Sequence, residues 1–162
     1  MIVMTPKSLL RLPAAFSPVR DLANGRFQPV LDDPTGAGRK DRVKRLIVCT
    51  GKIYYDLDAH DARKGAEDVA LVRIEEIYPF PSGALETVVA SYPALTEVVW
   101  TQEEPRNMGA LTFVGPRLRA IVPRGLPLRY VARPERASPA EGKPGDHNRE
   151  QQRILREALG LS

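Results

Sequence analysis

The sequence contains one cysteine and two histidines, and each shortage excludes a class of protein. A single cysteine, Cys49, cannot build a disulfide framework, so we expect a reducing compartment and a buried, small apolar role for this side chain. His60, His147 and one cysteine do not have the spacing of a zinc site, so we predict no metal ligands. Aromatic residues make up only 6% of the chain and do not alternate with basic residues, which predicts no nucleic-acid partner.

Long apolar runs and phosphate-binding motifs are also missing. No run approaches the roughly 20 apolar residues that cross a bilayer, and the start MIVMTPKSLLRLP lacks the features of a signal peptide. We therefore predict no membrane partner. No GxGxxG follows a predicted strand, no GxxxxGK[ST] is present, and no serine stands in a nucleophile elbow. These absences give little support to a nucleotide-hydrolysing enzyme, a dinucleotide-binding enzyme or a serine hydrolase.

The residues that are present indicate one α/β domain preceded by an arm. From Val43 onwards, buried strands are predicted at residues 43–49, 69–74, 96–101 and 126–132, and they alternate with helices at about 52–64, 83–91, 110–122 and 148–159. This order predicts a largely parallel sheet with helices on both faces. Right-handed crossovers would place every strand-to-helix turn at the same edge. In detail, we expect Gly65 and Ser82 to cap helices and Pro116 to kink or break one.

Residues 1–42 have no regular period and too little apolar surface for a domain of their own. Residues 2–4 suit the tail of a strand, Pro29 permits at most a short edge strand, and residues 32–38 have the composition of a loop. A strand that starts at the first residue suggests a longer polypeptide. The net charge is +4, and the densest basic cluster, residues 39–45, is interpreted as a solvated linker rather than a contact for a phosphate or an acidic partner.

The turn Thr50-Gly51-Lys52 is the first candidate site. It follows the first buried strand, and open α/β sheets bind their ligands beyond the carboxyl ends of their strands. Lys52 beside a helix amino terminus suits an anion such as a phosphate or a carboxylate. The alternative is a tight turn with a solvated lysine, and we favour it.

A second group of candidates follows the third predicted strand, in a polar turn at residues 102–109 that includes Gln102, Arg106 and Asn107. Glu103 and Glu104 suit general acid and base roles only if they share a site, and adjacent residues on an extended strand point opposite ways. We therefore favour capping, helix-dipole or interface roles. His147 is interpreted as a residue that caps the last helix or reaches a neighbour.

Six motifs, taken together, resemble one known family. The chain is similar to the carboxyl-terminal part of the thiamine-diphosphate-dependent subunit of 2-oxoglutarate dehydrogenase. The motifs are MTPKSLLR at residues 4–11, CTGKIYY at 49–55, VRIE at 72–75 with YPFP at 78–81, WTQEEPRNMG at 100–109, RPERASPAEG at 133–142, and His147 with Gln151-Gln152.

The resemblance implies a transketolase carboxyl-terminal-domain-like fold with a mostly parallel, five-stranded sheet. The fifth strand would lie at an edge, in the antiparallel direction. The whole subunit would form a homodimer, decarboxylate 2-oxoglutarate on thiamine diphosphate and Mg²⁺ in the tricarboxylic acid cycle, and succinylate a lipoyl group of the dihydrolipoyl succinyltransferase core. The expected compartment is the bacterial cytoplasm or the mitochondrial matrix.

The resemblance also implies that the groups that bind thiamine, metal and substrate lie in preceding domains. No catalytic, cofactor-binding or metal-binding residue is therefore assigned here, and the chain by itself is expected to be inactive. Residues 1–42 would pack on the preceding domain, and residues 43–162 would form the carboxyl-terminal domain, which supports the dimer. The alternative is a free-standing module that binds an anionic small molecule at the Thr50-Gly51-Lys52 turn.

Overall fold

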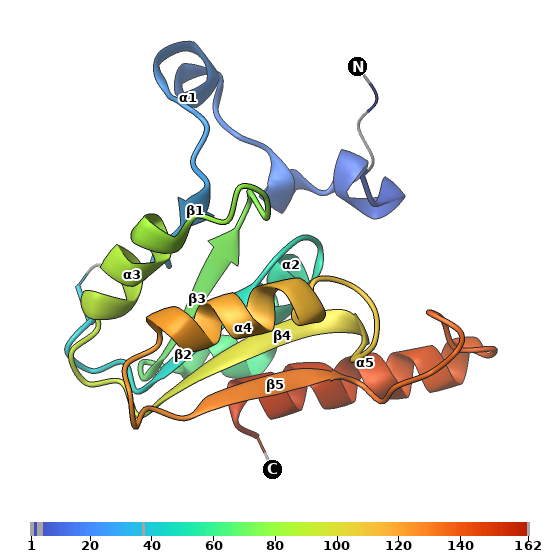
Figure 1. Ribbon diagram of the computed structural model, residues 1–162. Coiled ribbons are helices and arrows are strands. Elements are labelled where there is room, and N and C mark those ends of the chain that lie inside the picture. The colour runs from blue at the N-terminus through green and yellow to red at the C-terminus, as the bar shows by residue number, and fades with distance from the viewer. Residues whose placement is uncertain (1, 3–4, 37, 162) are drawn as a thin grey trace.

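A five-stranded sheet forms the centre of the molecule in the computed structural model, which describes residues 2, 5–36 and 38–161 (Figure 1). The strand order is β1-β3-β2-β4-β5, and the four strands β2 to β5 run parallel to one another. Strand β1 pairs with β3 in the antiparallel direction. The predicted α/β class and the antiparallel edge strand are confirmed. The strands are β1 Val30–Leu31, β2 Arg45–Cys49, β3 Val69–Ile74, β4 Glu97–Pro105 and β5 Leu128–Arg133.

Helices cover both faces of the sheet and create two cores. Alternate residues of β2 point to opposite faces, so Leu46 and Val48 belong to one core and Ile47 and Cys49 to the other. Helices α3 and α4 contribute to the first core, which contains the fully buried Trp100, and α2 and α5 contribute to the second. The helices that cover the sheet are α2 Ile53–Asp58, α3 Ser82–Ala90, α4 Leu111–Ile121 and α5 Pro144–Leu159.

Several predicted element boundaries are wrong. The helix expected at 52–64 ends at Asp58, and a separate 3-10 helix, Asp61–Gly65, follows it. His60 starts this second helix, because its Nδ1 accepts a hydrogen bond of 3.2 Å from the backbone N–H of Ala62. Gly65 is the last residue of that 3-10 helix rather than its cap, which is Ala66.

The structure also differs from the predictions for the later helices and strands. Pro81 is the N-cap of α3, and Ser82 is already its first residue. Helix α4 continues through Pro116, so the predicted break is wrong and the predicted kink stays a prediction. The buried face of the helix, with Val114 and Leu118, packs on the sheet and outweighs the local preference. Strand β4 extends to Pro105, four residues beyond its predicted end. Helix α5 starts at Pro144, so His147 lies in its first turn rather than before it.

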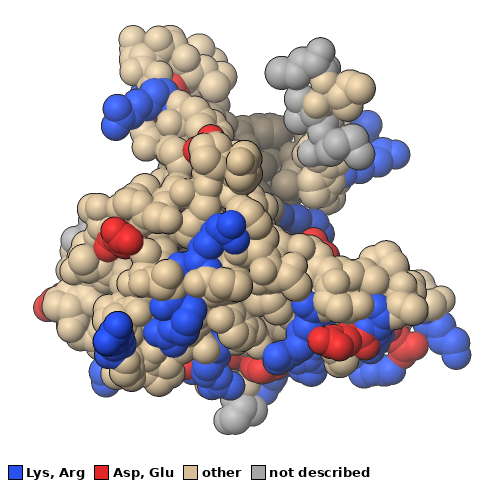
Figure 2. Space-filling model, in the orientation of Figure 1, with Lys and Arg blue, Asp and Glu red and all other residues tan. Residues whose placement is uncertain are grey.

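The arm, residues 5–28, stands off the sheet (Figure 1). It consists of two 3-10 helices, Lys7–Arg11 and Pro13–Ala15, and the short helix α1 Val19–Asn24, and none of the three contains a buried residue. Large apolar side chains are exposed along it, and Figure 2 shows a mostly uncharged surface around α1 with some Lys or Arg and Asp or Glu side chains beside it. The predicted strand at residues 2–4 lies largely outside the described residues.

The arm joins the sheet domain at Pro29. The carbonyl of Pro29 accepts hydrogen bonds from the N–H groups of Glu75 and Glu76, at 2.8 and 3.2 Å. Beyond β1, the carboxylate of Asp33 is buried and accepts from Arg63 at 2.5 Å and from the N–H of Leu71 at 2.9 Å. The segment predicted to be a loop is therefore fixed to the sheet by a buried charge.

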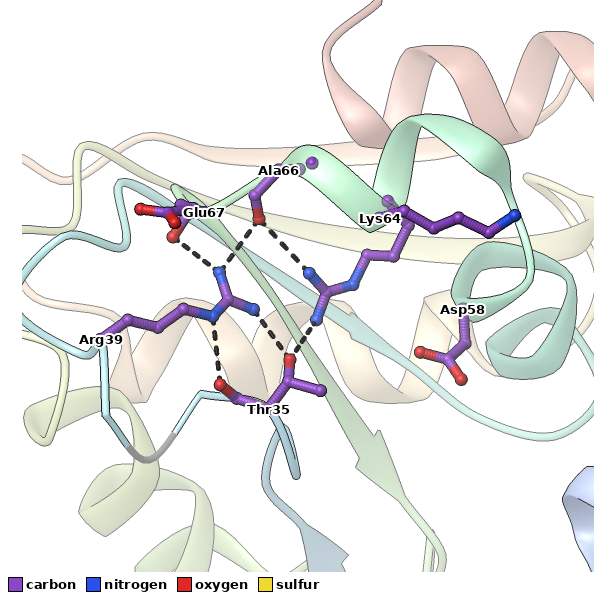
Figure 3. A pocket seen from close by; sticks show the side chains of 8 residues that line it. Thr35, Arg39, Asp58, Lys64, Ala66 and Glu67 are labelled. Atoms are coloured by element: carbon purple, nitrogen blue, oxygen red, sulfur yellow. Dashed lines mark hydrogen bonds between the residues drawn. The ribbon is translucent and has the colours of Figure 1, made fainter.

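Arg39 completes this buried group and overturns the solvated-linker interpretation at its own position. Its Nη2 lies 3.3 Å from the carboxylate of Asp33, and its Nη1 donates to the backbone carbonyls of Ala66, Glu67 and Val69. Figure 3 shows its guanidinium between Thr35 and the two carbonyls of Ala66 and Glu67. The basic run looked solvated because the sequence does not show the distant carbonyls that Arg39 meets.

Candidate functional site

The Thr50-Gly51-Lys52 turn lies at the carboxyl edge of the sheet, directly after β2, as predicted. Gly51 has φ = 70°, in the left-handed region that favours glycine. The hydroxyl of Thr50 donates to the carbonyl of Ile74, the last residue of β3, at 2.7 Å. The turn is thereby tied to the neighbouring strand.

Lys52 is only partly exposed, and its ammonium contacts two carboxylates. Its Nζ lies 2.5 Å from Oδ2 of Asp56 and 2.9 Å from Oε1 of Glu103. Burial alone lowers the pKa of Lys52, but the hydrogen bonds and charges of these two carboxylates outweigh burial and raise it above its usual value. Helix α2, which follows, has only six residues. The proposed anion site stays an untested prediction, and its cation already has two partners.

Gln151 from helix α5 completes what we call the carboxyl-edge cluster, namely Lys52, Asp56, Glu103, Arg133 and Gln151. Its Nε2 donates to Oδ2 of Asp56 at 2.8 Å and to Oε1 of Glu103 at 2.9 Å. Its Oε1 accepts from Arg133 at 3.3 Å. One buried amide on α5 thus connects two carboxylates and a guanidinium from three other elements, α2, β4 and β5.

Arg133 extends the cluster toward the loop before α5. Its Nε donates to the carbonyl of Glu103 at 2.8 Å, and its Nη1 lies 3.0 Å from Glu141. Its Nη2 lies 3.2 Å from Nδ1 of His147, so this histidine reaches a neighbour. A hydrogen bond from Arg136, followed by the charges of both arginines, holds the pKa of Glu141 below its usual value.

Gln102 is buried beneath the turn that follows β4. Its Oε1 accepts from the indole N–H of Trp100 at 3.1 Å and from the N–H of Leu111 at 2.9 Å. Its Nε2 donates to the carbonyls of Pro105 and Met108, at 3.0 and 2.8 Å. Gln102 therefore positions the turn and the start of α4.

The other candidate residues of this turn, Glu103, Glu104, Arg106 and Asn107, also contact groups within the domain. Glu103 faces Lys52, whereas Glu104 lies against Gly109, where an added Cβ would come within 3.0 Å of Glu104 Cβ. The two adjacent carboxylates thus have different surroundings. Arg106 donates to the carbonyl of Tyr130 at 3.0 Å. Asn107 exchanges two hydrogen bonds with the backbone of Arg136, at 2.9 and 3.1 Å.

The geometry of the carboxyl-edge cluster and of the turn after β4 is that of a structural network.

Burial raises the pKa of the Cys49 thiol to about 12, which leaves it protonated and unreactive at neutral pH. Within residues 2, 5–36 and 38–161, no three His, Cys, Asp or Glu side chains lie close enough to hold a metal ion. In the same part of the chain, no helix is both long and apolar enough to cross a bilayer.

Two features of the polar networks were not predicted from the sequence. They are the buried pair of Asp33 and Arg63, and the central position of Gln151 in the carboxyl-edge cluster. Asp33 stands in a run with loop composition, and Arg63 stands at the end of a predicted amphipathic helix. The only signal was the presence of charged residues at positions that pack on strands, and no spacing rule connects residues 30 or 48 positions apart.

Comparisons with known proteins identify relatives of nearly the whole chain. Residues 16–159 match the family described as 2-oxoglutarate dehydrogenase C-terminal. The chain is 48% identical to the 2-oxoglutarate dehydrogenase E1 component of an Exiguobacterium species and 47% identical to that of Shouchella clausii. Each alignment covers 98% of this chain and 17% of the relative, so the chain spans about a sixth of the length of these relatives.

A solved structure supports the fold independently. The chain resembles a "split gene transketolase, inactive beta4 tetramer", with a TM-score of 0.58 at 19% identity, over 93% of this chain and 46% of that one. This confirms the predicted transketolase-like carboxyl-terminal fold. The family match and the identities of nearly half over almost every residue lead to one conclusion: this chain belongs to the 2-oxoglutarate dehydrogenase C-terminal family.

Proposed function

We propose that this chain acts as the structural carboxyl-terminal domain of a 2-oxoglutarate dehydrogenase E1 subunit. The observation that carries the proposal is the 48% identity over 98% of the chain but only 17% of the relative's length. We infer that a chain so similar to one region of a longer enzyme has the same role as that region. The network of self-satisfied polar groups described above supports a role in structure rather than in chemistry.

The activity of the whole subunit forms part of the same proposal. The subunit decarboxylates 2-oxoglutarate on thiamine diphosphate and Mg²⁺ and passes a succinyl group to a lipoyl arm of the dihydrolipoyl succinyltransferase core. It acts as a homodimer in the bacterial cytoplasm or, in a eukaryote, in the mitochondrial matrix. This chain by itself is proposed to be inactive.

The described residues do not fit the cofactor. Mg²⁺ prefers carboxylate and carbonyl oxygens with open positions. The two facing carboxylates of the carboxyl-edge cluster, Asp56 and Glu103, already share the Lys52 ammonium and the Gln151 amide. We therefore assign thiamine diphosphate and Mg²⁺ to the preceding domains and derive no step of the reaction from this chain.

The arm supplies the proposed connection to those domains. Exposed apolar side chains recur along it, including Val19 at 80% and Leu22 at 76% exposure, and an apolar surface of this kind marks an interaction site. Because Pro29 is hydrogen-bonded to the sheet domain and β1 belongs to the sheet, we propose that the docking segment ends at residue 28 rather than at residue 42.

The test is a hybrid subunit. In the Exiguobacterium relative, the region that aligns with this chain is removed, and this chain takes its place. With thiamine diphosphate and Mg²⁺, the hybrid is expected to oxidise 2-oxoglutarate within about tenfold of the intact relative, a change of about 1.4 kcal/mol in the barrier. The truncated relative and this chain, each assayed by itself, are the controls and are expected to be inactive.

A hybrid that is soluble, dimeric and loaded with thiamine diphosphate, yet has no turnover, would contradict the proposal. Turnover by this chain in the absence of the preceding domains would contradict it as well.

A further inference from the structure

The chain enters the sheet domain at the carboxyl edge of the parallel strands. Strand β1 runs antiparallel to β3, and its first residue, Val30, pairs with Ile74, the last residue of β3. The residues before β1 therefore leave the sheet at this edge, beside the segment that follows β3 (Figure 1). Any polypeptide that precedes the arm approaches from the same side.

An aromatic patch, which consists of Tyr78, Phe80 and Phe113, lies on the segment after β3 and on α4. The ring centroids of Tyr78 and Phe80 are each 6.3 Å from that of Phe113. The guanidinium of Arg117 lies over the Phe113 ring at 3.6 Å. Tyr78 is 81% exposed, and aromatic rings contribute much of the binding energy of an interface when they become buried.

A hollow of about 380 Å³ adjoins this patch at the same edge. Phe113 borders both, and Thr50, Ile77, Gln102 and Glu104 are among the other residues of the wall. The hollow lies just beyond the carboxyl end of β2, where Thr50 follows the strand, and beside the last residues of β4, where Gln102 stands. An apolar side chain of a neighbouring domain would find aromatic and aliphatic contacts here beside polar groups that are already hydrogen-bonded.

The exposed large apolar side chains of the described residues have a clear distribution. All except Tyr78 belong to the arm or to Ile2 before it, and Tyr78 lies on the edge from which the arm leaves. The related E1 components are about six times longer than this chain, and the chain matches their C-terminal family, so their additional length precedes the arm. One body on that side would cover the arm and the patch together.

We propose that the aromatic patch and the adjoining hollow form a docking surface for the part of the same E1 subunit that precedes this chain. The proposal rests on the proposed function. It assigns to the preceding domains a second contact, separate from the arm, that presents apolar side chains to the Phe113 hollow.

The experiment measures the reactivity of a thiol introduced by Tyr78→Cys. The native Cys49 is fully buried and does not compete for a maleimide reagent. Arg124→Cys is the matched control, because Arg124 is exposed on the loop between α4 and β5, at the opposite edge of the sheet. Labelling at each position is followed by peptide mass spectrometry in this chain and in the hybrid subunit.

The labelling rate at position 78 is expected to fall about tenfold or more on going from this chain to the hybrid, as burial in a stable interface requires. The rate at position 124 is expected to stay within about twofold, since an exposed site away from the contact is unaffected. Equal rates at position 78 in a hybrid that turns over would overturn this inference and leave the proposed function standing. An inactive hybrid that still shields position 78 would overturn the proposed function alone.

A second measurement covers the case in which the hybrid does not fold. The truncated relative is added as a separate protein to the Tyr78→Cys variant, and the same loss of labelling is expected. Shielding that instead grows with the concentration of this chain by itself would identify a second copy as the occupant and would overturn the inference.

Discussion

The arm and the sheet domain differ in where their apolar side chains lie. Every strand from β2 to β5 contains fully or nearly buried apolar residues, and they form two cores. The helices of the arm contain no buried residue, and Phe16 is 62% exposed. Burial of apolar surface is the main source of stability, so the sheet domain is expected to fold by itself, while the arm needs a partner.

The region between them shows how such an arm is anchored. Asp33 places a buried carboxylate against Arg39 and Arg63, and β1 adds an edge strand. The anchor depends on a buried carboxylate that is paired with two guanidiniums. The arm instead exposes apolar side chains, which another protein surface could bury. Substitutions in the core, in the anchor and in the arm should therefore differ in their effects on stability.

Replacement of the central aromatic residue of the sheet should have the largest effect. Trp100 is fully buried, and Trp100→Ala is expected to lower the free energy of unfolding by about 3–5 kcal/mol, because it removes apolar contacts and leaves a cavity. Urea unfolding followed by far-ultraviolet circular dichroism measures this. Leu22→Ala, an equally apolar position on the arm, is the control and is expected to change stability by less than about 0.5 kcal/mol. Similar losses of unfolding free energy in both variants would show that the arm and the sheet domain do not differ in their contribution to stability.

Removal of the buried anchor charge should come next. Asp33→Asn leaves the guanidiniums of Arg39 and Arg63 without their carboxylate and is expected to cost about 3 kcal/mol. Asp41→Asn, an exposed position in the same segment, is the matched control. Equilibrium unfolding in urea compares them, and equal stabilities of the two variants would show that the buried group does not anchor the segment.

The hub of the carboxyl-edge cluster should contribute less, because the groups around it keep other partners. Gln151→Ala removes the amide from Asp56, Glu103 and Arg133 and is expected to cost about 1–2 kcal/mol. The next residue provides the control, since Gln152 is exposed on the same helix. A Gln152→Ala variant that loses as much stability as Gln151→Ala would point to helix propensity rather than to the cluster.

The acid limb of the stability profile should depend on Glu141. Its pKa is lowered in the folded protein by Arg136 and Arg133, so its contribution is fully present above its ordinary pKa and is lost as the pH falls below about 4.5. Glu141→Gln is therefore expected to flatten the decline of stability between about pH 5 and pH 3. Thermal unfolding across this range measures it, with the exposed Glu135→Gln as the control. Parallel declines in wild type and Glu141→Gln would refute the assignment.

The sequence predicted the sheet well because its strands depend on local patterns. Strand β3 is found at its predicted residues, and the apolar run that ends at Cys49 forms β2. Local patterns failed where distant partners decide the structure. Gln102 looked like part of a polar turn but lies inside a strand, because its amide is satisfied by Trp100 and by the start of α4.

The candidate site was predicted in position but not in its contacts. Lys52 stands at the carboxyl edge as expected, yet its partners, Asp56 and Glu103, come from two different elements. A single sequence indicates which edge a residue occupies, since chain order and crossover handedness determine that. It does not indicate which of many charged residues will meet there, because those distances depend on the packing of α2 and α5 against the sheet.

Hydrogen–deuterium exchange shows whether the arm becomes covered when the preceding domains are present. In this chain by itself, amides of residues 5–28 are expected to exchange fast while those of β2 and β4 are protected, because only the latter lie in a packed sheet. In the hybrid E1 subunit, exchange of the arm is expected to slow by about tenfold or more, as its apolar side chains become covered. An arm that exchanges equally fast in both proteins, in a hybrid that turns over 2-oxoglutarate, would show that the arm is not a docking segment.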